Sequence, residues 1–162
     1  ETGGQNAMVV DSSALIEQAV DDIILSAFGS AGQRCSALRV LYVQEDIADA
    51  LLTLLKGAME ELQLGDPHRL DTDIGPVIDA KAQAGLLAHI ERMKKEAKLV
   101  AVAPEPSAYD ASFVRPHAFE IPSIDMLKQE VFGPVLHIIR YEAMEAAFWA
   151  ECIAALRKKL TP

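Results

Sequence analysis

Cys35 is the first residue of this 162-residue chain whose type and setting suit catalysis. It follows residues 29–34, where small residues let a ligand and the backbone approach the sulfur closely. Arg34 places a positive charge beside the thiol, and a neighbouring cation favours the reactive thiolate. A cysteine between a loop and a strand also serves as a small buried hydrophobe. Local sequence therefore leaves two roles open for Cys35, nucleophile or packing residue.

Two carboxylates are further candidates. Glu1 precedes Gly3 and Gly4, where the backbone can crowd a ligand, and a carboxylate there suits a general base for water. Its alternative is an ordinary frayed terminal residue. Glu130 lies in residues 129–134 (QEVFGP), just before an apolar run, and suits hydrogen bonds to sugar hydroxyls. Taken alone, that hexamer is equally a turn into a strand.

Cysteine and histidine spacing predicts no metal site. Cys35 and Cys152 stand far apart in the chain, and no CxxC, HxxxH or HxH pattern occurs. Two cysteines make no disulfide framework, so we expect a reducing, cytoplasmic setting. Cys152 is expected to pack within a helix. Surface or loop positions are expected for all four histidines: His68, His89, His117 and His137.

Composition narrows the class of protein. Lysine plus arginine number 15 against 24 aspartates plus glutamates, a net charge of −9, which argues against a nucleic-acid surface. Hydrophobic residues make up 51% of the chain, which suits one globular domain. No apolar run approaches 18 residues, so no transmembrane segment is expected.

Apolar periodicity predicts helices alternating with short strands. The helices are expected over residues 14–28, 47–62, 78–95 and 141–159, the first capped by residues 11–13. Strands are expected over residues 7–10 (buried), 38–43, 99–103 and 135–139, with edge-like pieces at 113–114 and 118–121. This alternation favours an α/β fold, an open sheet covered by helices. No GxGxxG follows the first strand, so the usual dinucleotide fingerprint is absent.

Three segments, taken in order, resemble the aldehyde dehydrogenase superfamily. Residues 1–6 (ETGGQN) resemble its glutamate motif, residues 32–37 (GQRCSA) its cysteine motif, and residues 130–134 (EVFGP) its E-x-F-G-P motif. The resemblance extends over about residues 1–141 and implies that family's catalytic-domain fold. Residues 28–39 look most like the L-glutamate γ-semialdehyde (Δ1-pyrroline-5-carboxylate) dehydrogenases, in particular the C-terminal module of bifunctional bacterial proline utilisation A proteins.

The resemblance implies a role for each candidate. Cys35 would attack the aldehyde carbon, and its backbone N–H would help to stabilise the oxyanion. Glu1 would activate the water that hydrolyses the resulting thioester. Glu130 would bind the nicotinamide-ribose hydroxyls of NAD, and Phe132 would lie beside that cofactor. Ser36, which follows the nucleophile, would help to bind the α-carboxylate of the substrate.

Two departures from the family limit what is expected of this chain. The sequence begins at Glu1, without the family's NAD-binding domain, which would supply most of the cofactor site. Residues 142–162 do not resemble the family's usual continuation. We therefore expect a partial catalytic (thiol) domain over residues 1–141, a divergent helical tail over residues 142–162, and negligible turnover by the chain alone. FAD is expected only if the longer protein carries a proline dehydrogenase module.

The expected partners are a small-molecule aldehyde, a cofactor-binding domain and a second copy in a homo-oligomer. One alternative is a non-catalytic scaffold or interaction module that keeps relic catalytic residues. Another is a thiol hydrolase or acyltransferase that uses Cys35 without NAD, although the sequence places no histidine base near it.

Overall fold

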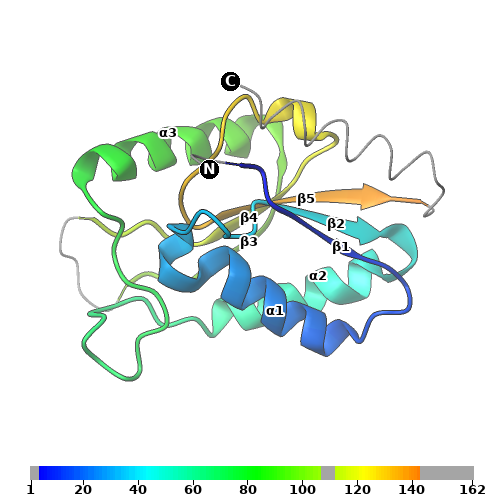
Figure 1. Cartoon of the computed structure of the whole chain (residues 1–162), viewed down its shortest axis with the longest axis horizontal. Coiled ribbons are helices and arrows are strands. Elements are labelled where there is room, and N and C mark those ends of the chain that lie inside the picture. Colours follow the sequence, from blue (N-terminus) through cyan, green and yellow to red (C-terminus); the bar gives the residue numbers. More distant parts are fainter. Residues whose placement is uncertain (1–3, 107–111, 143–162) are drawn as a thin grey trace.

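The computed structural model describes residues 4–106 and 112–142, which form a five-stranded sheet with helices on both faces (Figure 1). The sheet order is β1-β2-β5-β4-β3. Its strands are β1 (Ala7–Val10), β2 (Val40–Gln44), β3 (Lys98–Val102), β4 (His117–Glu120) and β5 (Val135–Tyr141). Strands β1, β2, β5 and β4 run parallel, and β3 pairs antiparallel with β4 at one edge.

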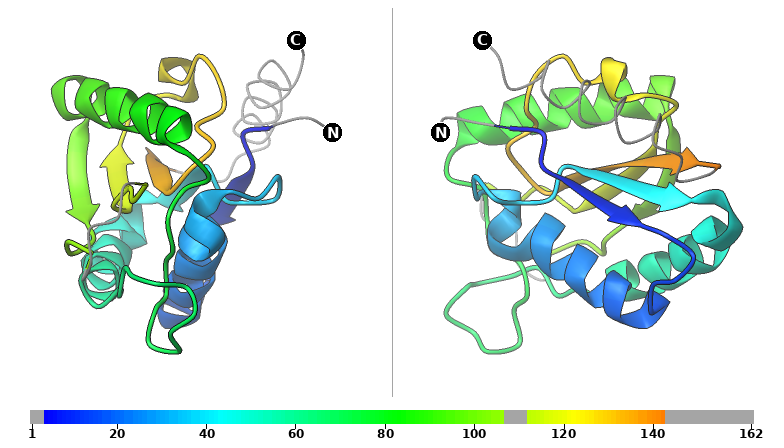
Figure 2. Two further views of the ribbon diagram at one scale, coloured as in Figure 1. Left: turned by 90° about the vertical axis from the view of Figure 1, so that its left-hand side faces the viewer. Right: turned by 45° about the vertical axis from the view of Figure 1, so that its right-hand side comes forward.

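Three helices cover this sheet. They are α1 (Ile16–Phe28), α2 (Glu45–Glu60) and α3 (Ala80–Glu96), and each bound lies within two residues of the sequence-based prediction. Helices α1 and α2 lie on one face and α3 on the other, as Figures 1 and 2 show. The predicted α/β fold is confirmed. No helix in the described part of the chain is long and apolar enough to span a membrane.

Burial follows the position of each strand in the sheet. The first four residues of β2 and the first five of β5 are buried, as expected for parallel strands covered on both faces. Strand β1 was predicted to be buried, but it forms an edge, and among its residues only Val10 is buried. A run of four apolar residues does not distinguish an edge strand from one buried on both faces.

The strand predicted at 118–121 is present as β4, but its predicted edge position was wrong, and so was the strand piece predicted at 113–114. Strand β4 lies between β3 and β5, inside the sheet, and residues 113–114 belong to no strand. Pro116 had suggested an edge because proline cannot donate to a strand ladder. It stands just before β4 begins, so the ladder loses no donor.

The predicted starts of the first and the last helix were also wrong. Helix α1 begins after Leu15, with no side-chain cap, whereas the Asp11 carboxylate accepts the Ser13 N–H within the preceding turn. At the other end, β5 continues through Tyr141, where a helix was predicted to begin. Glu142 is not helical, and residues 143–159 of that predicted helix, including Cys152, lie outside the described residues.

Two histidines predicted for the surface are buried instead. His137, on β5, has no exposed surface, and His117, on β4, is 7% exposed and stacks on Phe119 with ring centroids 5.7 Å apart. His89, on α3, is partly buried, and its Nε2 lies 2.9 Å from Nε2 of His137. The prediction failed because pairing between distant residues, which makes a buried imidazole tolerable, leaves no local pattern.

This histidine pair forms a directed chain of hydrogen bonds. His137 Nδ1 lies 3.1 Å from the Arg39 carbonyl, which only accepts, so Nδ1 carries the proton of the neutral ring. His137 Nε2 is then an acceptor, and His89 Nε2 donates to it. Burial lowers the pKa of His89 to about 4 and that of His137 to about 3. Both rings are therefore neutral at pH 7, and their bond connects α3 to the sheet.

The pair makes the fold sensitive to acid. Unfolded histidine binds a proton near pH 6.5, whereas the folded rings resist protonation until about pH 4. The free energy of unfolding is thus expected to fall as pH drops from 6.5 towards 4, by on the order of 3 kcal/mol from His89 alone. Urea titrations at several pH values would measure this loss.

A matched pair of variants isolates the histidine contribution. His89→Gln keeps a donor at the place of Nε2 but does not titrate, so the fall in stability should be smaller in this variant. His68→Gln changes a ring that is 92% exposed and contacts Asp66, and it should leave the part of the loss that comes from His89 and His137 in place. If the free energy of unfolding fell equally with pH in His89→Gln and in the unmodified chain, His89 would not be a source of the acid sensitivity.

Candidate functional site

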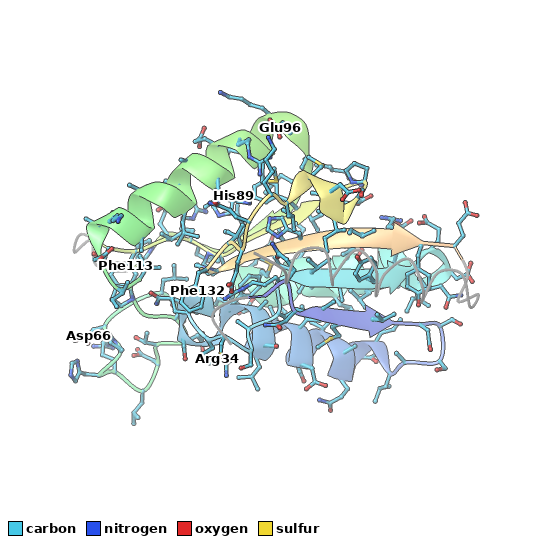
Figure 3. The ribbon with its side chains drawn as sticks, turned by 45° about the horizontal axis from the view of Figure 1, so that its top comes forward. Arg34, Asp66, His89, Glu96, Phe113 and Phe132 are labelled. Carbon is cyan, nitrogen blue, oxygen red and sulfur yellow. The ribbon has the colours of Figure 1, made fainter. Side chains whose placement is uncertain are left out.

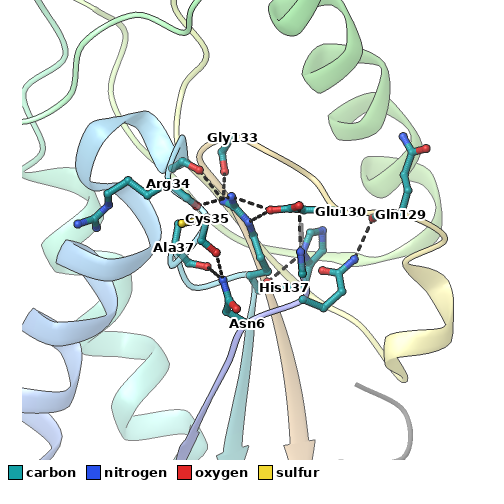
Figure 4. A network of polar contacts seen from close by, with 12 residues as sticks. Asn6, Arg34, Cys35, Ala37, Gln129, Glu130, Gly133 and His137 are labelled. Carbon is teal, nitrogen blue, oxygen red and sulfur yellow. Dashed lines mark hydrogen bonds and ion pairs between the residues drawn. The ribbon is translucent and has the colours of Figure 1, made fainter. Parts of the chain in front are cut away.

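Three segments far apart in the sequence meet at one edge of the sheet. Residues 4–6 precede β1, residues 32–37 precede β2, and residues 130–134 precede β5. Because β1, β2 and β5 are parallel neighbours, their amino ends lie side by side. The three segments therefore form one network of polar contacts, which Figure 4 shows from close by.

The cysteine segment begins with a turn of unusual backbone conformation. Ser30, Ala31 and Gly32 have φ values of 56°, 52° and 64°, all in the left-handed region. Two of them are not glycine, so this turn stores strain, and such strain gathers at functional sites. Gln33 then anchors the segment, because its Oε1 accepts the Ile78 N–H at 2.8 Å. Cys35 follows this turn and is exposed.

Arg39 joins the cysteine segment to Glu130. Its side chain is fully buried, and its Nη2 lies 3.1 Å from Glu130 Oε1. Burial lowers the pKa of Arg39, while the hydrogen bond and charge of Glu130 oppose that shift. The same guanidinium donates to the carbonyls of Gly32, at 2.6 Å, and Arg34, at 3.0 Å. One buried cation thus holds both the carboxylate and the backbone around Cys35.

Gly32 and Gly133 bring the same two segments into backbone contact. A Cβ added to Gly32 would lie 2.3 Å from the Gly133 oxygen, far inside van der Waals contact. A Cβ added to Gly133 would in turn meet the side chain of Leu86 at 2.4 Å. Position 32 therefore needs glycine, because it faces backbone at a positive φ, whereas a side chain at Gly133 would have to displace the end of Leu86.

The segment that follows Glu1 reaches both of the others. Gly4 N–H donates to Glu130 Oε2 at 3.1 Å, and Gln5 Nε2 donates to the Gln129 carbonyl at 2.9 Å. Asn6 Nδ2 donates to the carbonyl of Cys35 and, at 3.0 Å, to that of Ala37. Residues 4–6 thus bridge the carboxylate and cysteine segments.

A cavity of about 390 Å³ opens beside this network, between the start of α3 and residues 129–132. Glu130, Phe132 and His89 line it, and Figure 3 shows His89 on α3 and Phe132 on the facing segment. Phe132 is 47% exposed, and its ring centroid lies 5.0 Å from the Arg39 guanidinium carbon. The volume falls within the range of small-molecule sites, about 300–1,000 Å³.

Glu130 can still accept a hydrogen bond in this cavity. A carboxylate has about four lone-pair sites. Three are used, by the Gly4 N–H and by Nε and Nη2 of Arg39. The remaining capacity and the exposed face of Phe132 fit a ligand that carries hydroxyl groups and a planar ring.

The structure brings together most of the predicted site residues. Cys35 and Glu130 belong to one network, Ser36 is exposed next to Cys35, and Phe132 borders the cavity. Glu1 lies outside the described residues. Among the described residues, no group of three His, Cys, Asp or Glu side chains is placed to hold a metal ion.

The structure gives Arg34 a partner other than the Cys35 thiol. Its guanidinium donates to the Leu25 carbonyl on α1 at 2.9 Å, and Figure 4 shows its side chain pointing away from the network. An adjacent residue in an extended or turning segment projects in a different direction, so nearness in sequence did not bring the charge to the thiol.

Sequence reasoning missed Arg39 and Asn6. A charged residue just before the buried run of β2 is a recognisable signal, because buried charges require partners. That signal leaves the partner unidentified, since Glu130 stands 91 positions away. Asn6 gave no signal, because an asparagine before a strand is common in turns.

Comparisons with known proteins identify the family of the chain. The sequence profile of the aldehyde dehydrogenase family matches residues 1–151. The chain is 53% identical to the bifunctional protein PutA of Klebsiella aerogenes, over 99% of this chain and 13% of that protein. It is 36% identical to the 1-pyrroline-5-carboxylate dehydrogenase of Geobacillus sp. (strain WCH70), over 84% of this chain and 27% of the relative.

A solved structure shares the fold. A mutant of Proline Utilization A (PutA) from Bradyrhizobium japonicum matches with a TM-score of 0.89 and 48% identity. The match covers 98% of this chain and 16% of that one. The chain thus spans a small part of the length of these relatives.

The contact between the two glycine-bearing segments gives a prediction about stability. Gly32→Ala puts a Cβ against the Gly133 backbone at a positive φ, so it is expected to lower the free energy of unfolding by about 3 kcal/mol or more. Gly57→Ala is the matched control. Gly57 lies in α2 with open space where the methyl group of alanine would stand, so alanine should stabilise the chain by about 1 kcal/mol. Denaturant titration of both variants would check the opposite signs, and equal effects would contradict the close approach.

Proposed function

Because the chain belongs to the aldehyde dehydrogenase family, we propose that it supplies the thiol domain of an NAD-dependent enzyme that oxidises L-glutamate γ-semialdehyde to L-glutamate in proline catabolism. The observation that carries this proposal is the network around Arg39. It holds the exposed Cys35, the Glu130 carboxylate and the segment after Glu1 at one edge of the sheet.

Cys35 is the proposed nucleophile. As a thiolate it attacks the aldehyde carbon, a C–S bond forms, and the carbonyl oxygen becomes an oxyanion. The Cys35 N–H finds no acceptor among the described residues, which leaves it available to that oxyanion. A cysteine with this role must stay reduced, which suits the cytoplasm.

When bound, NAD would supply the hydride acceptor that oxidation of the Cys35-bound aldehyde carbon to a thioester requires. Glu130 and Phe132 are the residues of this chain that would hold its nicotinamide ribose and ring, because they border a cavity that fits a hydroxyl-bearing planar ligand. Glu1 would then take a proton from water, whose oxygen attacks the thioester carbon and releases the Cys35 thiolate.

Ser36 is the proposed substrate-binding residue. Its side chain is exposed beside Cys35, so its hydroxyl is free to face an incoming ligand. A hydroxyl donates one hydrogen bond to a carboxylate. The α-carboxylate of the semialdehyde would be its partner.

A chimeric enzyme tests the function. Residues 1–141 would replace the matching region of the Klebsiella aerogenes PutA, to which the chain is 53% identical. The chimera is expected to form NADH from Δ1-pyrroline-5-carboxylate and NAD. Cys35→Ser in the chimera should reduce turnover by about a thousandfold or more, because the nucleophile is lost. The chain alone is expected to form no NADH.

The control is Gln44→Ala in the same chimera, which changes a residue at the carboxyl end of β2, away from the network. This variant should keep the turnover of the chimera. Turnover that survives Cys35→Ser would contradict the proposed chemistry. A chimera that folds and turns over no substrate would favour a non-catalytic interaction module.

A further inference from the structure

Two peptide groups flank Cys35, and a different side chain holds each of them. The carbonyl of the preceding peptide, Arg34 O, accepts from Arg39 Nη2 at 3.0 Å. The carbonyl of the following peptide, Cys35 O, accepts from Asn6 Nδ2 at 2.5 Å. Figure 4 shows Asn6 and Arg39's partners arranged around this segment.

Asn6 holds this segment by more than one bond. Its Nδ2 also donates to the Ala37 carbonyl at 3.0 Å, so one amide spans Ser36 from both sides. Its own backbone carbonyl accepts the N–H groups of Arg39 and Val40 at 3.0 and 3.1 Å. The side chain and the main chain of Asn6 therefore tie the cysteine segment to the start of β2.

These contacts fix the direction of the groups that react. The orientation of the two flanking peptides sets where the Cys35 sulfur and its N–H point. We propose that Asn6 is a positioning residue that holds the Cys35 carbonyl, while Arg39 holds the peptide that carries the Cys35 N–H, and so keeps the thiol and that N–H directed towards one substrate carbonyl group. This inference rests on the proposed function of Cys35 as nucleophile.

The residue type suits this role. Asn6 Nδ2 carries two hydrogens, one for each of the two carbonyls. Aspartate has the same size but would set a carboxylate against both carbonyl oxygens. Serine would provide one donor only. Since residues 4 and 5 bind Glu130 and Gln129, the same short segment also keeps the cysteine and carboxylate segments in register.

Two reagents separate positioning from general stability. p-Nitrophenyl acetate acylates the thiolate through a tetrahedral oxyanion and releases p-nitrophenolate, so its rate depends on the N–H donor. Iodoacetamide alkylates the same sulfur by displacing iodide, and no oxyanion forms. The measurement is the ratio of acylation rate to alkylation rate at Cys35, in the full 162-residue chain with Cys152→Ser as background.

Asn6→Ala and Asn6→Asp are expected to lower this ratio about tenfold, part of the roughly 100–1,000-fold that complete loss of an oxyanion donor costs. Asn6→Ser, which keeps one donor, should give a smaller loss. Gln44→Ala is the control, because it also removes a long-range side-chain bond, from the Ser12 N–H at 2.9 Å, and should leave the ratio unchanged.

The outcomes distinguish the two proposals. The role of Asn6 would be overturned if the ratio were unchanged in all Asn6 variants while the ratio of the folded, unmodified chain was well above that of its urea-unfolded form. Cys35 would then remain the nucleophile. A ratio in the unmodified chain equal to that of the unfolded form would overturn both. Equal losses in the Asn6 variants and Gln44→Ala would mean that Asn6 acts through stability alone.

Discussion

The Arg39 guanidinium has no exposed surface, and the segments that carry Cys35 and Glu130 both bind to it. Burying a cation is costly unless it is paired and fully hydrogen-bonded. Its five N–H groups meet that condition through five contacts, to Glu130 Oε1 twice and to the carbonyls of Gly32, Arg34 and Gly133. The cysteine segment and the Glu130 segment are therefore folded around the same ion, and a change in either alters the environment of the other.

The site lies where the loops that supply the acceptors of Arg39 meet. Ligands of open α/β sheets usually bind at the carboxyl ends of the strands, where glycine-rich loops and helix N-termini bind phosphate. Here the candidate residues lie at the amino ends of β1, β2 and β5. The loops that meet there turn carbonyl oxygens towards a cation, which suits holding a nucleophile and a carboxylate rather than binding phosphate.

Local pattern was enough to predict the three helices and most strands and to single out Cys35 and Glu130 as candidates, but not to predict which residues hold them in place. The apolar periods of α1, α2 and α3 and the runs of β2 and β5 are local properties, and so are the glycine-bearing motifs around Cys35 and Glu130. The partner of Arg39 and the pairing of His89 with His137 depend on sheet order, which no short window contains. The edge prediction for β4 failed for the same reason.

The left-handed turn before Cys35 shows how the ion pair and the backbone depend on each other. Ser30 and Ala31 each cost on the order of 1 kcal/mol in this conformation, because their Cβ atoms crowd the backbone. The turn nevertheless sets the Gly32 carbonyl 2.6 Å from Arg39, the shortest of that residue's five hydrogen bonds. A hydrogen bond to a charged group contributes about 1.5–3 kcal/mol, and leaving the cation short of an acceptor would cost more. The strain persists because relaxing the turn would withdraw a carbonyl from a buried charge, so the same interaction that stabilises the sheet edge also keeps the chain before Cys35 in its strained form.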